Sequence, residues 1–140
     1  MKILIISNHA YPAQGPRAFR TTGLSEQLVK MGHEVVLYTV QGKYDYTQYE
    51  KETGVKRRDI NPRFATSADD ETHRYNLFDK FMYHFFHRLL MWPQCEFHYA
   101  VGKIIKENPN MDMLITIAYP PSIHSGAARA KKKYSAIFPK

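Results

Sequence analysis

The stretch that decides the fold is residues 3–40, which open with ILII (Ile3 to Ile6) and close with VVLYTV (Val35 to Val40). Each apolar run has the length of a buried strand. Between them, residues 18–31 carry apolar side chains at helical spacing, and Gly32 follows as a stop signal. Strand, helix and strand in this order predict a βαβ unit. In such folds ligands bind beyond the carboxyl ends of the strands, so the loop after Ile6 is the first candidate site.

The helix between these strands has clear start and stop signals. Pro16 stands near its start, where a missing N–H costs little, and Lys30 lies in its last turn. Its predicted core-facing stripe recurs every three or four residues. The members of this stripe are Ala18, Thr21, Leu24, Leu28 and Met31.

Length and composition limit the class of protein. At 140 residues the chain fits one domain that spans residues 1–140. It has no run of 18 apolar residues, no signal-peptide pattern and one cysteine, Cys95, so we expect a cytoplasmic protein without a disulfide. The formal charge of +7 would suit nucleic acid, an anionic membrane surface or a phosphorylated ligand alike.

Further strands and helices follow residue 40. Residues 55–60 predict a short third strand, and residues 61–75 predict a mobile loop because they carry turn formers without periodicity. A helix over about 96–107 is expected to turn Tyr99, Ala100 and Ile104 inward, with Val101 as a further candidate for this face.

The last part of the chain repeats the strand-helix pattern. MLITIA (residues 113–118) predicts a buried strand, residues 119–122 turn into a helix that runs to about Lys133, and residues 135–138 resemble the start of another strand. Strands that alternate with helices predict an α/β fold, a Rossmann-like parallel sheet flanked by helices.

The first loop, His9 to Arg20, has the features of an anion site. Gly15 permits a close approach of the backbone, and the following helix presents free N–H groups and a positive dipole end. Arg17 and Arg20 add two charges about one turn apart. These groups would suit a phosphate or a carboxylate; alternatively, Gly15 makes a turn and both arginines are solvated.

The second loop follows MLITIA and contains Tyr119, Pro121, Ser122 and His124. It also lies at the carboxyl end of a strand, so it is expected to meet the first loop across a cleft. His124 is suited to act on a substrate hydroxyl. The alternative is that Ser122 only caps the helix and that His124 is only a surface residue.

The third feature is a strongly aromatic amphipathic helix over residues 77–92 with a basic polar face, to which Arg57 and Arg58 add charge. Packing of its apolar stripe on the sheet is favoured, because both faces of a parallel sheet need cover. The alternative is a helix that lies in a membrane interface, with Phe81, Phe85, Arg88 and Trp92 facing the membrane.

Several common sites find no support in the spacing. The chain has neither G-x-G-x-x-G nor a P-loop, so a dinucleotide cofactor has no positive signal. His84 and His87 stand three apart, but no third ligand is placed by spacing, so no metal is expected. Nucleic-acid binding would rest on charge alone and is not expected.

Two segments resemble a known family. MKILIIS, a Tyr-Pro/Gly loop, an Arg-containing helix and GHEV resemble the N-terminal domain of GT-B glycosyltransferases. DMLITIAYPP and SGAARAKKKY resemble the same domain's fourth strand, exit loop and next helix. The group with the strongest resemblance is the retaining, nucleotide-sugar-dependent enzymes that build bacterial capsules, lipopolysaccharide and glycolipids.

The resemblance implies an enzyme of two Rossmann-like domains with the active site between them. The N-terminal domain mainly holds the acceptor, and the C-terminal domain holds most of the nucleotide-sugar. We therefore expect this chain to be the acceptor-side domain of such an enzyme, truncated, without a cofactor, and inactive without the missing C-terminal domain. The expected partners are a nucleotide-sugar and a glycan or lipid-linked acceptor, at the inner face of the membrane where the acceptor is a lipid.

The resemblance also assigns residues. Gly15, Arg17 and Arg20 match positions that meet the donor phosphates, although Gly15 is followed by Pro16 where many members have a second glycine. On the acceptor side, Tyr119, Pro121 and Ser122 match the loop that lines the acceptor in this family. Tyr11 and His124 are expected to join the acceptor side from their places in the two loops, but the family's histidine near the reacting sugar comes on a later strand, so that role is not transferred to His124. The alternatives are a non-catalytic module that docks on membranes or partners through residues 77–92, and one half of a GT-B-fold sugar-nucleotide epimerase.

Overall fold

The computed structural model describes residues 1–41, 44–61, 77–78, 81–82, 84–85, 95–117 and 121–135. The elements in chain order are β1 (Lys2–Ile6), α1 (Pro16–Lys30), β2 (Glu34–Thr39), α2 (Thr47–Thr53), β3 (Lys56–Asp59), α4 (Cys95–Glu107), β4 (Met113–Thr116) and α5 (Pro121–Lys133). The loop expected at 61–75 lies outside the described residues except for Asn61, and the strand expected at 135–138 lies outside them except for Ser135.

The four described strands form one parallel sheet in the order β3-β2-β1-β4. This confirms the predicted α/β class, and the order is that of the first four strands of a Rossmann sheet. After β3 the chain crosses to the other side of β1, so the strand order reverses between β1 and β4. Such a reversal is the topological switch point, where α/β proteins form a crevice at the carboxyl ends of the strands.

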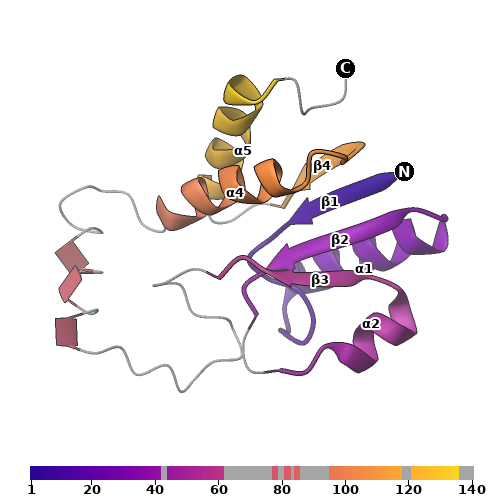
Figure 1. Cartoon of the computed structure of the whole chain (residues 1–140). Helices are drawn as coiled ribbons and strands as arrows, with labels where there is room; N and C mark the ends of the chain where they lie inside the picture. The colour runs from indigo at the N-terminus through magenta and orange to yellow at the C-terminus, as the bar shows by residue number, and fades with distance from the viewer. Residues whose placement is uncertain are drawn as a thin grey trace.

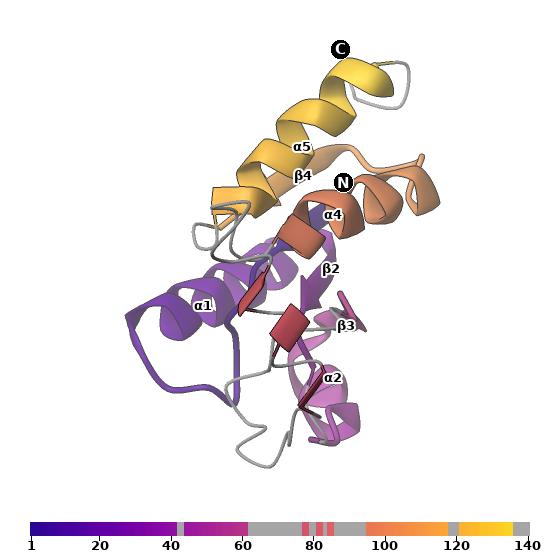
Figure 2. The same cartoon turned by 90° about the vertical axis from the view of Figure 1, so that its left-hand side faces the viewer.

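Both faces of the sheet are covered, as Figures 1 and 2 show. Alternate residues of β1 point to opposite faces: Leu4 and Ile6 pack with α4 and α5, while Ile3 and Ile5 pack on the side of α1 and α2. A strand that is buried on both faces must be apolar at every position, which explains the continuous ILII run.

Two helices differ from the prediction in which residues they turn toward the core. Met31, which the spacing places in the core stripe of α1, is 70% exposed, because α1 ends at Lys30 and Met31 already leaves the helix. Tyr99 of α4 points outward, whereas Phe97 is fully buried together with Val101. The inward face of α4 therefore begins two residues earlier in the chain than the sequence pattern suggests.

The edge strand and the short helix also differ from expectation. The sequence predicts a buried MLITIA strand, but the described residues of β4 are partly exposed, since β4 has β1 as its only partner among the described strands. The sequence pattern gives no prediction of α2. This helix has seven residues and buries only Tyr49, so the segment is too short to show a helical period in the sequence.

Candidate functional site

The two candidate loops leave the sheet side by side at the switch point. The Ile117 N–H donates a hydrogen bond of 3.0 Å to the carbonyl oxygen of Ile6, and Thr116 pairs in register with Ile6. The loop after β1 and the chain after β4 thus start from adjacent points, as their positions in the sequence predict. Residues 118–120, which include Tyr119, lie outside the described part of the chain.

The loop after β1 is anchored to α1 by hydroxyl groups. The Ser7 and Thr21 hydroxyls are buried and lie 3.0 Å apart. The Tyr11 backbone N–H donates to Thr22 Oγ1 at 2.9 Å, and the Ala13 N–H donates to the Ala10 carbonyl at 3.0 Å. These bonds hold the loop in one path over the start of the helix.

A cavity of about 420 Å³ lies at the start of α1. Arg17 gives this cavity a positive charge, and the residues that line it are His9, Ala13, Gln14, Gly15, Pro16, Arg17 and Ala18. Gly15 has a φ of 143°, which side-chain-bearing residues rarely adopt, so the path into the helix depends on glycine. Arg20 is exposed and does not line this cavity.

His9 adds a titratable group to this cavity. Partial burial lowers the pKa of the imidazole, and the nearby positive charge of Arg17 lowers this pKa further. A neutral ring is therefore favoured at neutral pH, and such a ring can accept a proton or a hydrogen bond from a ligand hydroxyl. Asn8 Nδ2 lies 3.5 Å from His9 Nε2. The sequence gives His9 only as the first residue of the candidate loop and assigns it no role; its signal is its place three residues after a buried strand.

Two buried polar atoms near the switch point have no hydrogen-bond partner among the described residues: Asn8 Oδ1, which follows β1, and Ser122 Oγ, which follows β4. Ser122 is only 4% exposed. A buried polar atom without a partner costs about 1–3 kcal/mol, so such atoms are expected to meet water or a ligand. The interpretation of Ser122 as only a helix cap is wrong in the described structure, because its hydroxyl makes no capping bond there.

The other predicted residues of the second loop start α5. Pro121 is its first residue and is exposed. His124 is also exposed, and its Nδ1 lies 2.7 Å from Thr116 Oγ1 at the end of β4. His124 is thereby directed back toward the carboxyl edge of the sheet. Neither His124 nor Ser122 lines the cavity at the start of α1.

Tyr11 belongs to a different group of residues. Its ring stacks on Tyr49 at 5.0 Å, and its hydroxyl lies 3.0 Å from that of Tyr44. The buried Arg57 guanidinium donates a hydrogen bond to the Tyr11 carbonyl and lies 3.9 Å from the centre of the Tyr46 ring. Tyr11 therefore faces α2 rather than the cavity. Arg57, which the sequence groups with a basic surface, is instead a buried support of the loop.

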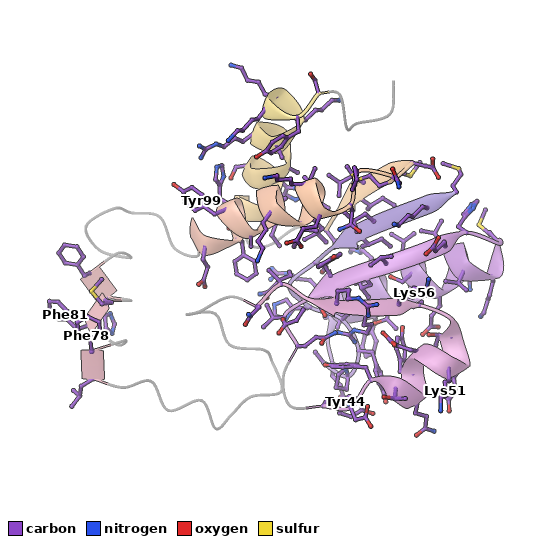
Figure 3. All side chains as sticks on the ribbon, in the orientation of Figure 1. Tyr44, Lys51, Lys56, Phe78, Phe81 and Tyr99 are labelled. Carbon is purple, nitrogen blue, oxygen red and sulfur yellow. The ribbon has the colours of Figure 1, made fainter. Side chains whose placement is uncertain are left out.

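The aromatic segment does not pack on the sheet where it is described. Residues 77–78, 81–82 and 84–85 are helical, and most of their apolar side chains are exposed, up to 89% for Leu77 and 65% for Phe81. Figure 3 shows Phe78 and Phe81 away from the sheet. The favoured prediction of core packing is thus wrong for these residues, because α1, α2, α4 and α5 already cover both faces. Arg88 and Trp92 lie outside the described residues.

Comparison with models of protein families, with curated proteins and with solved structures finds no match to this chain. Within the described ranges, no helix is long and apolar enough to cross a bilayer. The same residues contain no group of three or more His, Cys, Asp or Glu side chains arranged to hold a metal ion. The assignment of a function therefore depends on the geometry of the switch point and on the resemblance in sequence.

Proposed function

We propose that this chain is the acceptor-side domain of a GT-B glycosyltransferase that moves a sugar from a nucleotide-sugar to a glycan or lipid-linked acceptor. The observation that supports this best is the cavity at the start of α1, where Gly15 and Arg17 lie together at the switch point of a Rossmann-like sheet. This is the place where α/β folds bind phosphate groups.

The charges in the cavity suit a donor diphosphate. The positive end of the α1 dipole and the Arg17 guanidinium favour an anion, and together they would stabilise a leaving diphosphate as its charge develops. Pro16 supplies no N–H at the first helical position, so Arg17 carries more of this role. Arg20, one turn further along α1, would act at longer range.

Acceptor recognition is proposed for the neighbouring groups. Asn8 Oδ1 and Ser122 Oγ are buried acceptors without a partner in the described structure, and both suit the hydroxyl groups of a sugar. The neutral His9 ring would accept a hydrogen bond from an attacking hydroxyl. His124 and Tyr119 would extend this surface from the second loop, with Pro121 at its edge.

The test is binding of UDP- and GDP-sugars to the chain, measured by calorimetry with Arg17→Gln and the matched control Lys30→Gln at the other end of α1. Loss of one charge-assisted hydrogen bond is expected to weaken binding about tenfold or more in Arg17→Gln. Lys30→Gln should bind as the original chain does. Equal weakening in both variants would contradict a site at the start of α1. The chain alone should transfer no sugar, and detectable transfer would contradict the need for a second domain.

A second candidate function is supported by the exposed side chains of Phe78, Phe81 and Phe85, which would let the chain dock on a membrane surface. The test is co-sedimentation with anionic vesicles. Phe81→Ser combined with Phe85→Ser should lose most binding, whereas Phe19→Ser, an equally exposed phenylalanine on α1, should retain it. Vesicle binding that survives loss of Phe81 and Phe85 would count against this function.

A further inference from the structure

A second basic cavity, distinct from the one at the start of α1, lies between α4 and α5. Its volume is about 270 Å³, and four of its lining side chains are cations: Lys103 and Lys106 from α4, and Arg129 and Lys133 from α5. None of these residues lines the first cavity.

The floor of this α4–α5 groove is formed by small residues. Gly102, Gly126 and Ala130 line it and carry no side chain that would fill the space between the helices. A Cβ added at Gly126 would lie 2.7 Å from the His98 carbonyl oxygen, so the two backbones are in direct contact there. Close approach of the helices with small residues on the floor makes the surface concave, while the long cationic side chains form its walls.

The cations of the groove have few acidic neighbours. Lys103 forms an exposed pair with Glu107 at 3.8 Å. In the described part of the chain, no carboxylate lies within ion-pair distance of Lys106, Arg129 or Lys133. A lysine in the last turn of a helix interacts favourably with the helix dipole, and this effect explains Lys106 at the end of α4 and Lys133 at the end of α5. Lys103 and Arg129, further from the helix ends, complete a ring of positive charge that this effect does not explain.

Arg129 is held in place by a buried histidine. Its Nη1 lies 3.2 Å from His98 Nε2, and His98 Nδ1 lies 2.9 Å from the Ser125 hydroxyl, which donates to the Ser122 carbonyl at 3.1 Å. Since Arg129 can only donate, the His98 Nε2 must accept and the Nδ1 carries the proton. Burial and the charge of Arg129 both lower the pKa of His98, which keeps the ring neutral for this role.

The Arg129 guanidinium is thus oriented from two sides. It also lies 5.6 Å from the centre of the exposed Tyr99 ring, which projects from α4 (Figure 3). A guanidinium has five N–H donors, so the bond to His98 leaves donors for an anion. An oriented arginine with lysine charges around it suits a phosphate group.

We propose that the α4–α5 groove binds the phosphate or diphosphate group of a small ligand. The proposal goes beyond the glycosyltransferase function, because it concerns a separate surface of the domain. The concave shape favours a small ligand over an extended surface: pockets for drug-sized ligands have about 300–1,000 Å³, and this groove is slightly smaller. A membrane or a nucleic acid would instead be expected to use a broad, flat basic face.

The test is calorimetric titration of the whole chain with inorganic pyrophosphate at pH 7.5. Arg129→Gln and, as a second exposed position, Lys106→Gln should each weaken binding at this site about tenfold. Lys131→Gln is the matched control, because Lys131 is an exposed cation of α5 outside the groove, and it should change the affinity less than twofold. Circular dichroism verifies that each variant is folded.

Further variants and ligands distinguish binding in the groove from binding in the cavity at the start of α1 and from a diffuse attraction of anions to the basic surface. Arg17→Gln should leave binding in the groove unchanged, so failure of the proposed donor site would not affect this result. Equal weakening by Lys131→Gln and Arg129→Gln would overturn the proposal, because it would show that anions are attracted to the whole basic surface. Binding to anionic vesicles or to single-stranded RNA without binding to pyrophosphate would also overturn it.

Discussion

The contact between α4 and α5 at Gly126 gives the sharpest prediction of stability. A methyl group at this position would lie 2.7 Å from the His98 carbonyl oxygen, 3.0 Å from the His98 Cα and 3.1 Å from the Val101 Cβ. Two of these three atoms belong to the backbone, which cannot move aside as the end of a flexible side chain can. The Gly126→Ala variant must therefore push the two helices apart.

The expected magnitude follows from two opposing effects. Overpacking costs about 1–3 kcal/mol, and the backbone contact at Gly126 places the cost in the upper part of that range. Alanine regains about 1 kcal/mol over glycine in a helix interior. The net loss in the free energy of unfolding is then about 1–2 kcal/mol. In urea, with a slope of about 1.5 kcal/mol per M, the midpoint should fall by about 1 M.

The matched control is Gly23→Ala in α1. No described atom other than its own helix and chain neighbours lies within 4 Å of a Cβ built at Gly23. The same substitution should therefore raise the free energy of unfolding there, by about 0.5–1 kcal/mol. Both variants are measured by urea unfolding followed by circular dichroism. An unchanged or higher midpoint in Gly126→Ala would refute the helix contact.

Three further predictions concern buried polar groups. The pKa of His98 is lowered in the folded chain, so as the pH falls the unfolded chain takes up a proton at this residue before the folded chain does. The free energy of unfolding should therefore fall as the pH drops below about 6.5. His98→Gln should reduce this loss, measured as the difference between urea titrations at about pH 7 and about pH 5. Arg57→Gln should lower the free energy of unfolding by about 2–4 kcal/mol in the same assay, because it removes the bonds of a buried guanidinium to the Tyr11 carbonyl and the Thr39 hydroxyl. The exposed neighbour Arg58 is the control: a change above about 0.5 kcal/mol in Arg58→Gln would argue against a special role of the buried guanidinium. Ser122→Ala should raise the free energy of unfolding by about 0.5–1 kcal/mol, seen as a slightly higher thermal midpoint, since it removes a buried hydroxyl without a described partner. A clear loss of stability would indicate that the hydroxyl is already bonded.

The sequence is sufficient to predict the elements that bury a full face. The predicted bounds of β1, β2, α1 and α5 lie within two residues of the observed ones, because the two strands are apolar runs and the two helices begin at a proline. The parallel sheet follows from the alternation of strands and helices. These features depend on the order of neighbouring residues in the chain, which a single sequence shows directly.

Other features depend on what lies opposite in three dimensions. The aromatic stripe of residues 77–85 satisfies the helical period, but no sheet face remains for it to cover. The burial of Arg57 cannot be seen from KRRD, because it depends on the Tyr11 carbonyl 46 residues earlier in the chain. Likewise, the α4–α5 groove combines cations from two helices, and the nearest of them in the chain, Lys106 and Arg129, stand more than 20 residues apart.

The two basic cavities differ in how the fold creates them. At the start of α1, the sheet topology itself supplies the site, because the strand order reverses beside a helix N-terminus and two loops end there with buried polar atoms that lack described partners. Between α4 and α5, the concave surface depends on one close helix contact at Gly126 and on a histidine that fixes one arginine. A methyl group at Gly126 should therefore disturb the second cavity and leave the first intact. Measuring pyrophosphate and nucleotide-sugar binding on the Gly126→Ala variant would thus separate the two sites without changing a single charge.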